Sequence, residues 1–312
     1  MADIKLFSIN DGVAGELRTQ SPAIERSLQT LIERNLEVLL GLRFLSTEYS
    51  TGRVHNGRID TLGIDEDDSP VILEYKRRVD ENVINQGLFY LDWLMDHQAE
   101  FQLLVEKVFG HEAATRIDWS EPRLICVAGD FTRYDEHAVQ QIDRSIDLVR
   151  YRKYDGDLLL LELANGSWRP KEATIPEVTS SGGVEEEIRR VPSTQRGFLE
   201  LFERSSKELQ WLWVGIEEFL LNLGDDVQVK QLKHYKAFRR LRNFASGEIH
   251  PNVNDIVIFV KLDIASIVLE EGFTRDVREI GHYGTGNVEI RIRNETDFER
   301  AKPLMRMAYG AE

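Results

Sequence analysis

The stretch "GRIDTLGIDEDDSPVILEYKRR", residues 57–78, decides the fold of the first half of the chain. Two runs of strand-forming residues flank the polar turn "DEDDSP", which is typical of an antiparallel hairpin. Asp60, Glu74 and Lys76 are charged residues inside these runs. Side chains two residues apart share a face of a strand, and pairing of the two strands brings Asp60 beside Glu74. The stretch therefore predicts two carboxylates and an amine on one face of a sheet.

The residues around the hairpin predict a mixed sheet flanked by helices, so we expect an α/β (α+β) fold. Ser21-Pro22 is typical of a helix start, and apolar residues at helical spacing follow as far as Gly41. The order of strand 71–75, helix 81–96 and the buried strand in "PRLICVAGDF" predicts a right-handed parallel crossover. Further strands are expected at 43–49, 54–64, 149–153 and 158–163, and a further helix at 135–148.

A domain boundary is predicted by the segment from Pro170 to Pro192, which contains three prolines, "SSGG" and "EEE". We expect a first domain at 1–169, a linker at 170–195 and a smaller α+β domain at 196–312. The second domain should be helical over 196–224, form strands at 253–262 and 287–293, and end in a helix at 296–309.

The composition narrows the protein class. The chain has 312 residues, 42% of them hydrophobic, which is enough for two buried cores. It shows no leader pattern and no apolar run of membrane-spanning length, so we expect a cytoplasmic protein that does not enter a membrane. Cys126 is the single cysteine, which excludes an intrachain disulfide and a thiolate metal cluster. The net charge of −15 means that any nucleic-acid contact needs a local basic patch.

The charged residues of the hairpin suggest a metal site. Two neighbouring carboxylates repel each other, and a raised pKa, a basic neighbour such as Lys76 or a divalent cation relieves that repulsion. Carboxylate oxygens suit Mg²⁺ or Mn²⁺. Glu25 lies seven residues before Ile32 and so falls on the buried face of the first helix.

Gln86 and Tyr90 are one turn apart on the second predicted helix, where they could orient a water or a phosphate. Simpler explanations remain open at this point. Glu74 and Lys76 could form an exposed ion pair, Glu25 could complement its helix N-terminus, and Tyr90 could be an ordinary core residue.

The pattern "GRIDTLGID…VILEYKR…VINQGLFYLDWL" resembles the PD-(D/E)XK nuclease superfamily, especially the NucS-type catalytic domain once catalogued as DUF91. The resemblance implies a restriction-endonuclease-like α-β-β-β-α-β core. It also implies that Asp60, Glu74 and Glu25 bind metal, that Lys76 is the catalytic lysine, and that Gln86 and Tyr90 are accessory helix residues. Ile59 stands where many members of the superfamily have proline.

The second half resembles DUF5655, through "GFTRDVREIGHYGTGNVEIRI" and "DFERAKPLMRMAY". That family has no assigned chemistry. The Gly-rich "GHYGTGN", residues 281–287, lacks the pattern of a phosphate-binding loop and is predicted to be a turn.

The resemblance implies a Mg²⁺-dependent (or Mn²⁺-dependent) endonuclease that hydrolyses DNA phosphodiester bonds, in DNA repair or in defence against foreign DNA. The alternative is an inactive nuclease fold that binds nucleic acid or another protein. A homodimer would allow both strands of a duplex to be cut.

A basic stretch in the second domain, "KQLKHYKAFRRLR" at 230–242, is the expected DNA-binding surface. Tyr235 and Phe238 within it could stack on bases. The other interpretation is a solvated basic face, or one that docks on an acidic surface. Its basic residues are Lys230, Lys233, Lys236, Arg239, Arg240 and Arg242.

Overall fold

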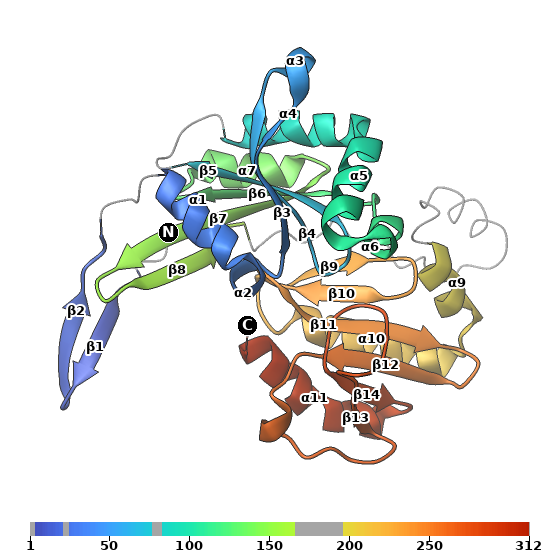
Figure 1. Cartoon of the computed structure of the whole chain (residues 1–312). Helices are drawn as coiled ribbons and strands as arrows, with labels where there is room; N and C mark the ends of the chain where they lie inside the picture. Colours follow the sequence, from blue (N-terminus) through green and yellow to red (C-terminus); the bar gives the residue numbers. More distant parts are fainter. Residues whose placement is uncertain (1–3, 21–24, 77–82, 166–195, 312) are drawn as a thin grey trace. The chain divides into compact units, whose positions relative to one another are not determined.

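A computed structural model describes residues 4–20, 25–76, 83–165 and 196–311 (Figure 1). The chain forms two compact units, Met1–Asn165 and Gly166–Glu312, and each is described by itself. The predicted linker at 170–195 lies outside the described residues. No helix within the described ranges is long and apolar enough to cross a membrane.

The first unit is built on a six-stranded mixed sheet of order β3-β4-β5-β6-β7-β8. The β4–β5 pair is antiparallel and β5, β6 and β7 are parallel, which confirms the predicted hairpin and crossover. The strands are β3 (Arg43–Ser50), β4 (Arg58–Ile64), β5 (Pro70–Lys76), β6 (Arg123–Ala128), β7 (Ser145–Tyr154) and β8 (Leu158–Leu163).

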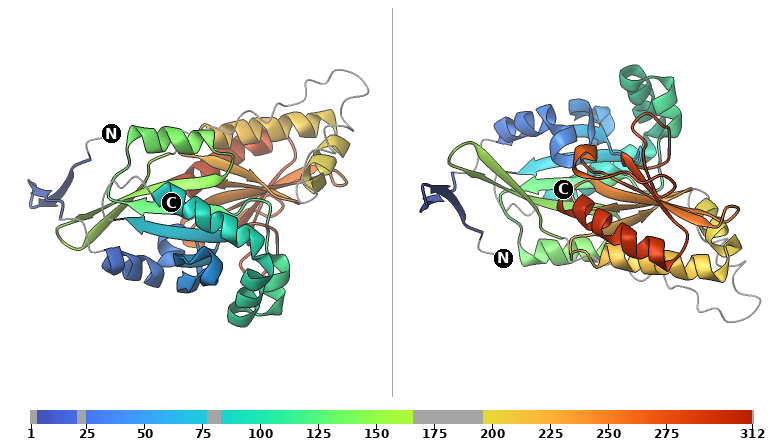
Figure 2. Two further views of the ribbon diagram at one scale, coloured as in Figure 1. Left: turned by 90° about the horizontal axis from the view of Figure 1, so that it is seen from above. Right: turned by 90° about the horizontal axis from the view of Figure 1, so that it is seen from below.

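Helices cover both faces of this sheet (Figure 2). The even-numbered core residues of β4 to β7, such as Leu62, Ile72 and Leu124, share one hydrophobic cluster with residues of α4 to α7. On the other face, α1 reaches β4 through Gln29, whose Nε2 donates to the Asp60 carbonyl over 2.8 Å. The helices are α1 (Glu25–Arg34), α2 (Leu36–Leu40), α4 (Val83–Asp96), α5 (Gln98–Phe109), α6 (His111–Arg116) and α7 (Arg133–Gln141). The α/β (α+β) class is thus confirmed for this unit.

Several predicted elements of the first unit have different bounds. The single helix expected to run to Gly41 is two helices, α1 and α2, with Asn35 between them. The strand expected from residue 54 begins only at Arg58, because residues 52–55 form the short helix α3 (Gly52–His55), which ends at Asn56 in a left-handed conformation (φ 45°). The helix expected to reach residue 148 ends at Gln141, since Ile146 and Leu148 belong to β7 and to the core. The N-terminal hairpin of β1 (Leu6–Asn10) and β2 (Val13–Leu17) was not predicted.

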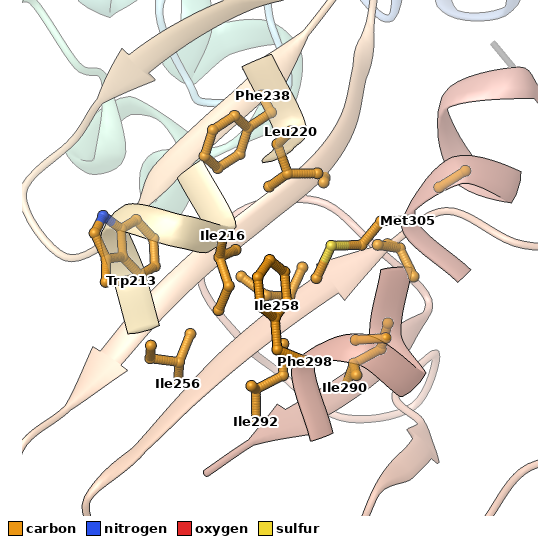
Figure 3. Packing of buried hydrophobic residues seen from close by; sticks show 14 of the residues in the cluster. Trp213, Ile216, Leu220, Phe238, Ile256, Ile258, Ile290, Ile292, Phe298 and Met305 are labelled. Atoms are coloured by element: carbon orange, nitrogen blue, oxygen red, sulfur yellow. The ribbon is translucent and has the colours of Figure 1, made fainter. Parts of the chain in front are cut away.

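The second unit holds an antiparallel six-stranded sheet of order β13-β14-β12-β11-β10-β9. Its core packs Trp213 and Ile216 of α10 and Phe298 of α11 against the sheet (Figure 3). The predicted strands at 253–262 and 287–293 correspond to β12 and β14. The elements are α9 (Arg196–Arg204), α10 (Lys207–Leu221), β9 (Gln228–Gln231), β10 (Lys236–Arg239), β11 (Asn243–His250), β12 (Asp255–Val260), the 3₁₀ turn η1 (Ile264–Ser266), β13 (Thr274–Asp276), β14 (Val288–Ile292) and α11 (Glu295–Gly310).

The stability of the second unit is expected to fall as pH rises above neutrality. His250 contacts Asp255 through Nδ1 (3.2 Å) and Glu248 through Nε2 (2.9 Å), and these two carboxylates raise the pKa of its imidazole to about 9. The folded pKa lies above the ordinary value of about 6.5, so the stabilisation is complete below that pH and is lost as pH rises through about 9. In urea denaturation between pH 6 and 9.5, the His250→Gln variant should show a shallower decline than the parent chain. Parallel declines would contradict this role of His250.

Candidate active site

The structure brings Asp60 and Glu74 together at the end of the β4–β5 ladder. The last paired residues there are Thr61 and Leu73. Beyond this pair, the carboxylates of Asp60 and Glu74 accept the hydrogen bonds from the facing backbone N–H groups. The Asp60 backbone N–H donates to Glu74 Oε1 (3.2 Å), and the Tyr75 backbone N–H donates to Asp60 Oδ2 (3.0 Å). Lys76 follows on the same face of β5 as Glu74 and is half-buried.

Glu74 is a carboxyl group in an unfavourable environment for charge. Its side chain has 0% exposure, and its Oε2 has no hydrogen-bond donor among the described residues. Burial, and then the charge of Asp60, raise its pKa to about 9, while the Asp60 backbone N–H and the charge of Lys76 oppose that rise. A cation between the two carboxylates would favour the charged form of Glu74.

The donor set fits a hard divalent cation that keeps several waters. Mg²⁺ is commonly bound by one or two protein carboxylates together with phosphate oxygens of the substrate. Asp60 and Glu74 can supply the two carboxylates. Within the described ranges, no group of three or more His, Cys, Asp or Glu is arranged to hold a metal. Glu25 begins α1, but its side chain lies outside what the structure describes.

Gln86 and Tyr90 both lie on α4 and form a hydrogen-bonded pair at the start of β4. The Tyr90 hydroxyl accepts from Gln86 Nε2 (3.3 Å) and from the Arg58 backbone N–H (3.2 Å). Gly57 makes this approach possible, since a Cβ there would lie 2.5 Å from Cε1 of the Tyr90 ring. Tyr90 is therefore a core residue, 6% exposed, whose hydroxyl also holds the backbone of Arg58, two residues before Asp60.

An open cleft of about 800 Å³ lies over this region. Asp60, Gln86 and Tyr90 line it, whereas the buried Glu74 does not. The other lining residues are Glu48, Ser50, Gly52, Asn56, Gly57 and Arg58.

Comparisons with known proteins match one domain family to each of the two structural units. Residues 24–117 match the family model described as the endonuclease NucS C-terminal domain, and residues 200–311 match the domain of unknown function DUF5655. We call the first unit the NucS-type domain and the second the DUF5655-type domain, after the family models that they match. This confirms the family resemblance of both halves.

A Haemophilus influenzae protein, described as an uncharacterized protein, is 27% identical over 311 residues, which are 98% of this chain and 99% of that protein. Two solved structures show local similarity. A repair endonuclease from Pyrococcus abyssi is 22% identical with a TM-score of 0.28, over 41% of this chain and 47% of that chain. An EndoMS–dsDNA complex is 21% identical with a TM-score of 0.24, over 42% and 47%. The matched region thus spans about half the length of those solved chains.

Two charged residues of the NucS-type domain were absent from the sequence-based site. Register pairs Thr47 with Thr61 and Tyr49 with Ile59, so Glu48 lies opposite Asp60. Arg58 pairs with Ser50 and lies two residues before Asp60, on the same face. The two-residue spacing of Arg58 and Asp60 in the sequence could have predicted that they share a face of the strand. The position of Glu48 could not be predicted in this way, because it depends on the β3–β4 register.

Cys126 is the nearest thiol to the site. It is the register partner of Glu74 on β6, it is fully buried, and burial raises its thiol pKa.

In the DUF5655-type domain, the predicted basic stretch is divided among several environments. Lys230 and Arg239 are buried, with 4% and 6% exposure. Phe238 is fully buried in the domain core, so its expected stacking on bases is wrong. Tyr235 is also buried, at 7% exposure.

Two further residues of that stretch are engaged in ion pairs. Lys236 Nζ lies 2.7 Å from Glu217, and Arg240 Nε lies 2.6 Å from Asp226. Lys233 is exposed and Arg242 is partly buried. The six side chains therefore do not form one exposed basic surface, and a role in DNA contact stays a prediction for the exposed part.

Proposed function

We propose that the chain is a Mg²⁺- or Mn²⁺-dependent endonuclease that hydrolyses phosphodiester bonds in DNA, in DNA repair or in defence against foreign DNA. The observation that carries the proposal is the Asp60–Glu74 pair, in which two carboxylates converge and the buried Glu74 Oε2 has no hydrogen-bond donor among the described residues, an arrangement that a bound cation would satisfy. The NucS match over residues 24–117 supports the same reaction, and DNA is proposed as the substrate on the strength of that match.

In this mechanism Asp60 and Glu74 would hold the ion, and Glu25 at the start of α1 is proposed as a third donor. A divalent cation held there would lower the pKa of a coordinated water and polarise the phosphate. Lys76, on the face of Glu74, positions or helps deprotonate the attacking water and stabilises the charge that develops on the phosphate. Gln86 and Tyr90 hold the backbone that leads into Asp60, so that its carboxylate is fixed before substrate binds.

The test is a cleavage assay on supercoiled plasmid, linear duplex, mismatched duplex, single-stranded DNA and RNA, with Mg²⁺, Mn²⁺ or EDTA. We expect cleavage of DNA that needs the metal and falls by about 10²- to 10⁴-fold in Lys76→Ala and in Asp60→Asn. Asp92→Asn removes an exposed carboxylate of α4 and serves as the matched control with unchanged cleavage. Cleavage that persists in both site variants would overturn the assignment, and DNA binding without cleavage would favour an inactive nuclease fold.

A further inference from the structure

We propose that Arg58, held in place by Glu48, forms a phosphate-binding subsite of the cleft and contacts a phosphodiester of the polynucleotide next to the Asp60–Glu74 pair. This inference rests on the proposed nuclease function and adds a substrate contact to it.

Charge in the cleft is the first argument. The lining includes the carboxylates Glu48 and Asp60, which repel a phosphate. Arg58 is the single Arg or Lys among the lining residues of the described cleft, and its side chain is 67% exposed. Among the described side chains of the lining, the guanidinium of Arg58 is therefore the group that attracts a polyanion, and Arg58 lies two residues before Asp60 on β4.

The backbone at Arg58 is fixed from two sides. The Tyr90 hydroxyl accepts from the Arg58 N–H over 3.2 Å. The preceding residue, Gly57, exchanges hydrogen bonds with Thr51: the Thr51 N–H donates to the Gly57 carbonyl (3.0 Å), and the Gly57 N–H donates to Thr51 Oγ1 (2.9 Å). Arg58 therefore projects from a rigid position, which reduces the entropy lost when it binds a ligand.

The side chain of Arg58 is directed by Glu48. Its Nε lies 2.8 Å from Glu48 Oε2, and Glu48 has a backbone φ of +50°, a conformation that non-glycine residues seldom adopt. Such a backbone is energetically unfavourable, whereas an ion pair this exposed contributes little to stability. The Glu48–Arg58 ion pair therefore does not compensate for the energetic cost of the Glu48 backbone conformation. Backbone strain of this kind is typical of functional sites.

The chemistry of the guanidinium completes the argument. Glu48 engages the Nε edge, and the Nη1 and Nη2 groups carry further donors in the planar fork that matches phosphate oxygens. A lysine at this position could not bind Glu48 and a phosphate through two fixed edges. Glu48 is thus a positioning residue that acts through Arg58.

The test measures binding of a fluorescent DNA oligonucleotide by anisotropy at several salt concentrations, with Lys76→Ala as the common background to prevent cleavage. Arg58→Gln should weaken binding about 5- to 20-fold and lower the slope of log K against log salt by roughly 0.7–0.9, as expected for one lost phosphate contact. The matched control is Arg116→Gln, which alters an ion-paired arginine that does not line the cleft and should change neither quantity. Glu48→Ala and Glu48→Gln both remove the repelling charge, but only glutamine keeps an oxygen that can accept from Arg58 Nε. Glu48→Ala should therefore bind DNA about threefold more weakly than Glu48→Gln when Arg58 is present, and the two should differ by less than twofold after Arg58→Gln.

The outcomes separate the two proposals. If the Lys76→Ala chain binds DNA and Arg58→Gln leaves both affinity and salt slope unchanged, the subsite is wrong and the nuclease proposal stands. If the parent chain neither binds nor cleaves any polynucleotide, the proposed function fails and the subsite fails with it. An equal effect of Arg116→Gln would also overturn the subsite, because the loss would then reflect net charge.

Discussion

The Glu74→Gln variant is expected to lose metal-dependent cleavage by at least about 10²-fold, while its metal-free form unfolds no more readily than the parent chain. Burial and Asp60 raise the pKa of Glu74 to about 9, so without metal this carboxyl group is mostly neutral near pH 7. A neutral amide of the same shape can replace it in the fold. It cannot supply the negative oxygen that a divalent cation requires.

The pH dependence sharpens this expectation. The folded pKa of Glu74 lies above its ordinary value of 4.5, so the unfolded chain releases this proton first and stability falls as pH rises from about 4.5 to 9. Glutamine does not titrate, so the advantage of the variant should widen by up to about 1.4 kcal/mol per pH unit. Chemical denaturation in EDTA at pH 6, 7, 8 and 9 measures this difference. A variant that unfolds more readily at every pH would show that Glu74 is already ionised in the metal-free fold.

The Arg123→Met variant is expected to lose about 3–5 kcal/mol of unfolding free energy. Arg123 lies on the central strand β6, with Nη2 2.7 Å from Asp147 and Nη1 3.3 Å from Asp65. All three side chains are 4–5% exposed, so removing the guanidinium takes away the positive charge that both buried carboxylates contact.

The matched control is Arg116→Met, in which the arginine is 51% exposed and pairs with Glu112 at 87% exposure. That substitution should change the unfolding free energy by less than about 0.5 kcal/mol. Urea denaturation of both variants at one pH gives the comparison. Equal losses would mean that the buried ion pairs add nothing beyond ordinary surface contacts.

The convergence of Asp60 and Glu74 could be predicted because it follows from local rules. The polar turn sets the hairpin, the hairpin sets the register, and alternation of side chains sets the shared face. Glu48 could not be placed in this way. A register shift between Phe44 and Ser46 interrupts β3, so alternation counted from its first residue does not tell which side chain faces Asp60.

The basic stretch at 230–242 shows another limit of reading along the chain. Its charges are adjacent in sequence, but β9 and β10 distribute them over different environments. The partners of Lys236 and Arg240 are Glu217 and Asp226, on neighbouring segments 19 and 14 residues away. Local charge counts cannot anticipate partners that tertiary folding supplies.

The buried Cys126 makes the chain convenient for site-selective labelling. It is the single thiol of the protein, and its complete burial and raised pKa keep it from reacting with thiol reagents while the sheet is closed. A cysteine introduced at the exposed Lys233 would then carry a fluorophore alone, without removal of the native residue. Because Cys126 is the register partner of Glu74, the slow reaction of the native thiol would report how often the sheet opens beside the proposed metal ligands.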